Sequence, residues 1–152
     1  MTTAAELLDD AVRRLDGVPK EGLGEERETR WRGHRIVRVG EAWHLGVLLL
    51  TDGRTLATAE VLRAAEPGRR GYTAESARHR AERRALALRG GFAEGDVVHV
   101  GWSEIDVSAV DAGGASGPLA LIDGVPSVRW SSAGGFMPLE AYLRERLELL
   151  GR

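Results

Sequence analysis

The stretch from residue 43 to residue 63 constrains the fold of this 152-residue chain more than any other. It reads WHLGVLLLTDGRTLATAEVLR, in which two strand-like runs flank the pair Asp52-Gly53. Asp-Gly between apolar runs is the strongest short-range signal for a β-hairpin. The first run is apolar from Leu45 to Leu50 except at Gly46, so both of its faces must be covered. We therefore predict a central strand with a layer on each side.

The segments before this hairpin give a helix, a linker and a strand. Thr3 and Glu6 form a capping box ahead of apolar residues at helical spacing, which predicts a helix over residues 3–16. Residues 17–33 are polar and contain Pro19 and several glycines, so we predict a loop or linker. Alternation then predicts a meander of three strands, over about residues 34–39, 42–50 and 54–65.

The second half of the chain predicts two more helices around further strands. Thr73 is a candidate N-cap, and Gly90-Gly91 stops the arginine-bearing helix that follows, whose alanine face we expect to lie on the central strand through Leu48. Pro138 suits the first position of a last helix. Between these helices we predict strands at 96–102 and 105–107, a flexible loop at 111–117, a hairpin of 119–122 with 127–130, and a turn at 131–135.

Together these elements predict one α+β domain over residues 1–152, with its sheet and helix core at 34–150. We expect a mainly antiparallel sheet of about six strands and three helices.

Composition excludes several classes of protein. The net charge of −2 argues against a nucleic-acid partner and against a membrane surface. There is no cysteine, which excludes disulfides, thiolate metal sites and cysteine nucleophiles, and Lys20 is the only lysine. The first residues mix acids and bases, unlike a secretory signal, and no apolar run approaches the ~20 residues of a membrane span. We expect a cytoplasmic protein without a cofactor.

Three residues of the second predicted helix have the types and spacing of metal ligands. Glu75, His79 and Glu82 lie at i, i+4 and i+7, so they share one face and could bind zinc or manganese. The same spacing also describes a solvated helix face with acid–histidine contacts. That face lies opposite the alanines, which favours the solvated interpretation.

A glycine-rich turn after a predicted strand is the candidate ligand site. The turn contains Ser131, Ser132, Gly134 and Gly135, and Trp130 stands beside it. If its amides open a helix, they could hold a small acidic ligand. Trp43 and His44 on the predicted central strand are candidates for lining a pocket, with core packing as the alternative.

The same region resembles the Nudix hydrolases in one register. Glu75, Arg83 and Gly90 have the spacing of that family's glutamate, arginine and glycine, and GVLLLTDGRTLAT is similar to the strands that open a Nudix domain. The resemblance implies a metal-dependent pyrophosphohydrolase. However, the family's metal-binding glutamates would fall at Arg84, Ala87 and Leu88.

A second resemblance extends over nearly the whole chain. EAWHLGVLLL, RGYTAESARHRAERRALALRGGF and MPLEAYL resemble small proteins of high-GC bacteria that have no established function and sometimes carry a glutaminase label. The residues give that activity no mechanism, because Lys20 has Gly17 rather than serine three positions earlier and no cysteine is present.

These observations favour a non-catalytic ligand-binding or protein-interaction module that forms a homodimer and binds an unknown small molecule. The alternative is a diverged Nudix-like or amidohydrolase enzyme that uses a metal at Glu75, His79 and Glu82. A third hypothesis is nucleic-acid contact through the arginines of the same helix; no aromatic residue is interleaved with them, which argues against it.

Overall fold

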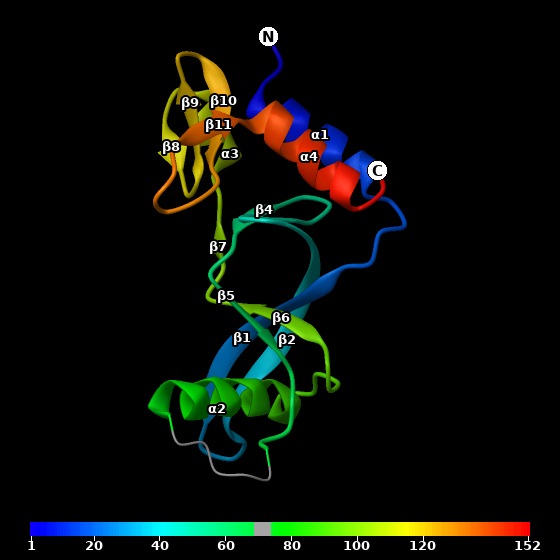
Figure 1. Ribbon diagram of the computed structural model, residues 1–152, viewed down its shortest axis with the longest axis vertical. Helices are drawn as coiled ribbons and strands as arrows, with labels where there is room; N and C mark the ends of the chain where they lie inside the picture. Colours follow the sequence, from blue (N-terminus) through cyan, green and yellow to red (C-terminus); the bar gives the residue numbers. More distant parts are fainter. Residues whose placement is uncertain (69–73) are drawn as a thin grey trace. The chain divides into compact units, whose positions relative to one another are not determined.

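The computed structural model describes residues 1–68 and 74–152, and the chain divides into two compact units (Figure 1). Unit 1 contains Met1–Lys20, Trp43–Thr58 and Trp102–Arg152, and unit 2 contains Glu21–Ala42 and Ala59–Gly101. The sequence predicted one domain over residues 1–152, whereas each of these units is assembled from separate stretches of the chain.

Unit 1 combines helices with two groups of antiparallel strands. The end of β2 (Gly33–Leu45) pairs with β3 (Leu48–Leu50), which pairs with β4 (Thr55–Ala57), which pairs with β7 (Ser103–Glu104). A separate four-stranded sheet has the order β11-β10-β9-β8. Its strands are β8 (Ala115–Ser116), β9 (Leu119–Ile122), β10 (Val125–Arg129) and β11 (Phe136–Pro138), and the helices of the unit are α1 (Ala4–Arg14), α3 (Val107–Asp111) and α4 (Leu139–Leu149).

The first helix is confirmed together with its cap. The Thr3 hydroxyl accepts a hydrogen bond from the Glu6 amide, and the Glu6 carboxylate accepts one from the Thr3 amide. A distant side chain completes the cap, because the Asp111 carboxylate accepts hydrogen bonds from the amides of Ala4 and Ala5 at 2.8 and 3.0 Å. The start of α1 is thereby tied to the end of α3.

Both predicted Asp-Gly hairpins are present. Leu50 pairs with Thr55 across Asp52-Gly53, and Ile122 pairs with Val125 across Asp123-Gly124. The prediction of one strand over residues 42–50 is wrong, because Gly46 has a φ of +64° and turns the chain between β2 and β3. A glycine is required there, since other residues rarely adopt a positive φ.

The apolar run of the sequence lies in the core of unit 1, as predicted. Leu48, Leu49 and Leu50 are fully buried, and β3 lies between β2 and β4. All three helices of the unit contribute to this core, and α1 and α4 run side by side (Figure 1). The prediction that the arginine-bearing helix covers this strand is wrong, because its buried residues pack within unit 2.

Unit 2 is a mixed sheet with one helix. The strand order is β5-β6-β1-β2, and the pairs are antiparallel except β1 with β6. The strands are β1 (Glu21–Thr29), β2, β5 (Glu60–Arg63) and β6 (Val97–Val100), and the helix is α2 (Glu75–Arg89). Its core is formed by Ile36, Leu62, Leu86, Phe92, Val98 and Val100.

The prediction of a linker over residues 17–33 is wrong, because most of this stretch is β1. Its glycines serve close packing within the strand. A Cβ on Gly24 would lie 2.6 Å from Ile36 Cγ2 and 2.8 Å from Val98 Cγ1, so no larger residue fits. Beyond Gly24 the strand is exposed and pairs with β2, which explains its polar composition.

The α+β class is confirmed, with four helices among the described residues instead of three. Through β2, which belongs to both units, hydrogen bonding continues as β5-β6-β1-β2-β3-β4-β7, so the strands form a mixed seven-stranded and an antiparallel four-stranded sheet.

The strand predicted at 105–107 is replaced by the start of α3, and the loop predicted at 111–117 contains β8. The predicted cap Thr73 lies outside the described residues. None of the helices in the described part of the chain has the length and apolar character of a membrane span.

An ion cluster connects α2 to the strands of unit 2. The Arg83 guanidinium donates to both carboxylate oxygens of Glu60, at 2.6 and 3.1 Å, and pairs with Glu26, which also contacts His34 at 2.8 Å. The hydrogen bond from Arg83, and then that with His34, lowers the pKa of Glu26 below its usual 4.5. Bonding to Glu60 and Glu26 raises the pKa of Arg83.

This cluster predicts a pH dependence of stability. A carboxylate whose pKa is lowered in the folded state stabilises it above the unfolded pKa, and the contribution is lost as the pH falls. We expect the urea midpoint of the wild type to fall as the pH drops below about 4.5, and to fall less in Glu26→Gln. Glu28→Gln, an exposed neighbour on the same strand, is the control. Equal acid sensitivity in all three proteins would contradict the prediction.

Candidate functional site

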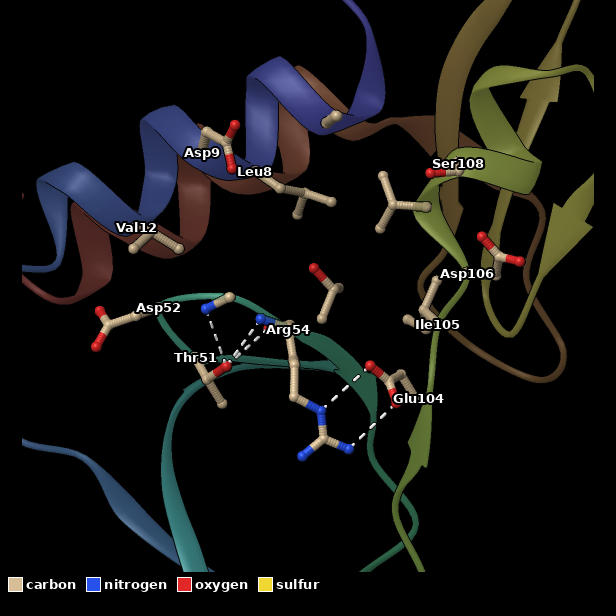
Figure 2. Close-up of a pocket in the computed structure, with 14 residues that line it drawn as sticks. Leu8, Asp9, Val12, Thr51, Asp52, Arg54, Glu104, Ile105, Asp106 and Ser108 are labelled. Atoms are coloured by element: carbon tan, nitrogen blue, oxygen red, sulfur yellow. Dashed lines mark hydrogen bonds and ion pairs between the residues drawn. The ribbon is translucent and has the colours of Figure 1, made fainter.

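A pocket of about 560 Å³ lies within unit 1 (Figure 2). Helix α1 forms one wall, the turn between β3 and β4 forms the base, and the segment from β7 into α3 forms the opposite wall. The residues that line it are Ala5, Leu8, Asp9 and Val12 from α1, residues 51–55 from the turn, and residues 104–108 from the far wall.

The apolar part of the lining belongs to the core. Ala5, Leu8, Asp9 and Val12 share one face of α1 because Leu8 and Asp9 each lie three or four residues from both Ala5 and Val12. Leu8 and Ile105 are each 4% exposed and pack in the core cluster of unit 1. The core therefore holds these two side chains in place, and the apolar surface open to a ligand comes from Ala5, Val12 and Val107, which are not fully buried.

Hydrogen bonds hold the polar residues at the bottom of the pocket in place. The Thr51 hydroxyl accepts a hydrogen bond from the Arg54 amide at 2.9 Å. The Arg54 guanidinium donates two parallel hydrogen bonds to the Glu104 carboxylate, each of 3.2 Å (Figure 2). This pair connects the turn between β3 and β4 to β7 and neutralises the single guanidinium of the lining.

Negative charge remains after this pairing. The lining has four carboxylates, of which Glu104 is used by Arg54, and Asp106 accepts a hydrogen bond from the Ala109 amide as the N-cap of α3. Asp52 lies 3.9 Å from the ammonium of Lys20. Asp9 makes no ion pair or hydrogen bond through its carboxylate with any described residue. The pocket is thus acidic.

Thr55 adds an unused hydroxyl. The residue is 8% exposed, and its side chain makes no hydrogen bond within the described part of the chain, although its carbonyl accepts one from the Ile105 amide. Thr55 lines the pocket, so its hydroxyl is available to a bound molecule.

The glycine-rich turn predicted as a ligand site lies elsewhere in unit 1. It leads into β11, not directly into a helix. The Ser131 hydroxyl accepts hydrogen bonds from the amides of Ala133 and Gly134 at 3.2 and 2.9 Å, so these two amides are already used. Trp130 is half exposed, while Ser132 and Gly135 lie at the surface.

Trp43 and His44 follow each other on β2. Trp43 is 6% exposed, its indole N–H donates to the Val18 carbonyl at 2.8 Å, and the Lys20 ammonium lies 4.3 Å from its ring centroid. Trp43 therefore has the contacts of a core residue. His44 is partly buried, with Nε2 2.8 Å from the Gly46 carbonyl oxygen.

The predicted metal ligands lie on α2 in unit 2. Glu75, His79 and Glu82 are all exposed, whereas the buried residues of this helix are Ala85, Leu86 and Ala87. The alanine face is buried only toward its end, since Ala77 and Ala81 are partly exposed. A metal role for these three side chains stays a prediction.

No pattern in the sequence predicted the acidic pocket. Its carboxylates come from residues 9, 52, 104 and 106, and no spacing rule connects them. Comparison with protein families, with curated proteins and with solved structures finds no match to the chain, so the two family resemblances stay predictions.

Proposed function

We propose that this protein is a non-catalytic binding module whose acidic pocket takes a small molecule with an ammonium group on an apolar body. The observation that carries the proposal is the Asp9 carboxylate, unpaired in the described structure, on the same pocket wall as the partly exposed apolar side chain of Val12.

The dimensions and chemistry of the lining support this ligand class. A volume of about 560 Å³ is within the range of roughly 300–1,000 Å³ typical of small-molecule sites. The ammonium group would form an ion pair with Asp9, and the Asp106 carboxylate would add electrostatic attraction. The Thr55 hydroxyl would form a hydrogen bond with the ligand. Ala5, Val12 and Val107 would contact the apolar body.

A binding role is favoured over catalysis by the residue types of the lining. Histidine, cysteine and lysine are the usual nucleophiles and proton carriers at neutral pH. None of these residue types lines the pocket among the described residues. The predicted homodimer and the metal-dependent enzyme stay hypotheses with no further support.

The experiment uses 2-phenylethylammonium as the probe and 2-phenylethanol as its uncharged match. Titration of the full chain, followed by amide chemical shifts in NMR spectra, should move the signals of Leu8, Thr55 and Asp106. We expect a Kd on the order of 1 mM for the ammonium and weaker binding of the alcohol. Shifts at residues far from the pocket, or equal binding of both probes, would contradict the proposal.

A matched pair of variants tests whether the Asp9 carboxylate is the group that binds the ammonium. Asp9→Asn should raise the Kd of the ammonium probe roughly fivefold, because it removes one partly exposed ion pair. Asp16→Asn makes the same change of charge at an exposed residue outside the pocket and should leave the Kd unchanged. If both variants weaken binding equally, the attraction is only that of the overall charge.

A further inference from the structure

The loop between β1 and β2 presents a tryptophan to solvent. Thr29 pairs with Gly33, so Arg30, Trp31 and Arg32 form a three-residue hairpin loop closed by a glycine with a φ of +67°. The Thr29 hydroxyl accepts a hydrogen bond from the Arg32 amide at 3.1 Å. Trp31 is 90% exposed, so an ordered loop carries a large aromatic side chain that contributes little to the core.

Arginines surround this tryptophan. The Arg30 guanidinium lies 5.8 Å from the centroid of the Trp31 ring. Arg27 and Arg35 stand directly opposite each other on the two strands, an arrangement of like charges that disfavours folding unless an anion lies between them. Arg27 is paired with Glu25 at 3.1 Å.

Arg35 has no such carboxylate. Its Nε is buried without a hydrogen-bond partner, and within the described residues none of Arg30, Arg32 and Arg35 forms an ion pair. Arg30 and Arg32 flank Trp31 in the loop and Arg35 follows on β2, so three arginines without a carboxylate partner among the described residues lie in or next to the loop.

The net charge of the whole chain is close to zero, but the basic and acidic residues are unevenly divided between the two units. Unit 2 has 13 basic and 11 acidic residues, whereas unit 1 has eight basic and 12 acidic residues. The sequence argued against nucleic acid because no aromatic residue is interleaved with the arginines of α2. The fold supplies one on the hairpin of the same unit.

We propose that the loop Arg30–Arg32, together with Arg35, binds single-stranded nucleic acid. A base stacks on the exposed face of Trp31, as on the aromatic residues of single-strand-binding proteins, and the guanidinium groups hold the neighbouring phosphates. An anionic membrane fits less well, because Trp31 is the single apolar side chain of the loop and would bury little area.

Fluorescence anisotropy of a dye-labelled oligothymidylate at low salt tests the proposal on the full chain. We expect saturable binding that weakens steeply as salt is added, and weaker binding of a duplex, whose bases are already stacked. Trp31→Ala should raise the Kd about tenfold, the loss expected for one stacked base, and Trp31→Phe should restore most of it. Arg35→Gln should weaken binding and reduce the salt dependence.

The control is Trp130→Ala, which removes a half-exposed tryptophan from unit 1 and should leave the Kd unchanged. Absence of binding at low salt overturns the proposal, as does binding that Trp31→Ala leaves intact. Sedimentation with vesicles of phosphatidylserine and phosphatidylcholine is the second arm. If Trp31 is needed for vesicle binding while the oligonucleotide does not bind, the partner is a membrane and the proposal is wrong.

Discussion

Gly90→Ala is expected to destabilise unit 2 by about 3 kcal/mol, at the upper end of the cost of overpacking. Gly90 ends α2, and a Cβ built there would lie 1.6 Å from the Ile36 carbonyl oxygen. This oxygen belongs to the backbone of β2, so it cannot move aside as the end of a flexible side chain could. Either the helix end or the strand must shift.

Amide hydrogen exchange measures this effect where it arises. Amides of β1, β2 and α2 should exchange faster in Gly90→Ala, and the urea midpoint should fall. Gly53→Ala is the matched control, because a Cβ there meets nothing within 4 Å, and it should be close to neutral. If Gly90→Ala is as stable as the wild type, the close contact between α2 and β2 does not exist as described.

Tyr142→Phe is expected to destabilise unit 1 by roughly 2–4 kcal/mol, because it leaves two backbone groups without their partner. Tyr142 is 2% exposed on α4. Its hydroxyl accepts a hydrogen bond from the Val47 amide and donates one to the Leu45 carbonyl, both at 2.8 Å. These groups flank Gly46, so a single hydroxyl holds the turn between β2 and β3.

Chemical denaturation followed by circular dichroism gives the free energy of unfolding for this variant. Ser132→Ala, which removes an exposed hydroxyl from the same unit, should change the stability by less than about 0.5 kcal/mol. Faster exchange should appear at the Val47 amide in Tyr142→Phe alone. An unchanged free energy of unfolding would mean that water satisfies both backbone groups.

The fold was predictable where the determining interactions are local. The capping box of Thr3 and Glu6 and the two Asp-Gly hairpins depend on residues close together in the sequence, and all three are present. Strand β1 was missed because its glycines mark a turn in most sequences. Here Gly24 accommodates Ile36 and Val98, residues that only the pairing of strands brings close.

The binding sites were less predictable than the fold, because folding brings together residues that are far apart in the sequence. Asp9 and Thr55 are 46 positions apart, and neither has a motif around it. The sequence also placed the arginine-bearing helix on the wrong strand, because alanines at helical spacing specify a close-packing face without specifying its partner. Arg83 was one of the helix arginines in the nucleic-acid hypothesis, whereas in the structure it forms ion pairs with Glu26 and Glu60.

The sequence by itself determined the α+β class, the buried run from Leu48 to Leu50 and the two Asp-Gly turns. Side-chain periodicity and turn chemistry are properties of neighbouring residues, so they can be recognised before folding. Only the tertiary structure decided that α1 and α4 cover that run, that Asp9 and Thr55 share a pocket, and that Trp31 is exposed to solvent. Those arrangements depend on long-range packing and charge pairing, which no local pattern encodes.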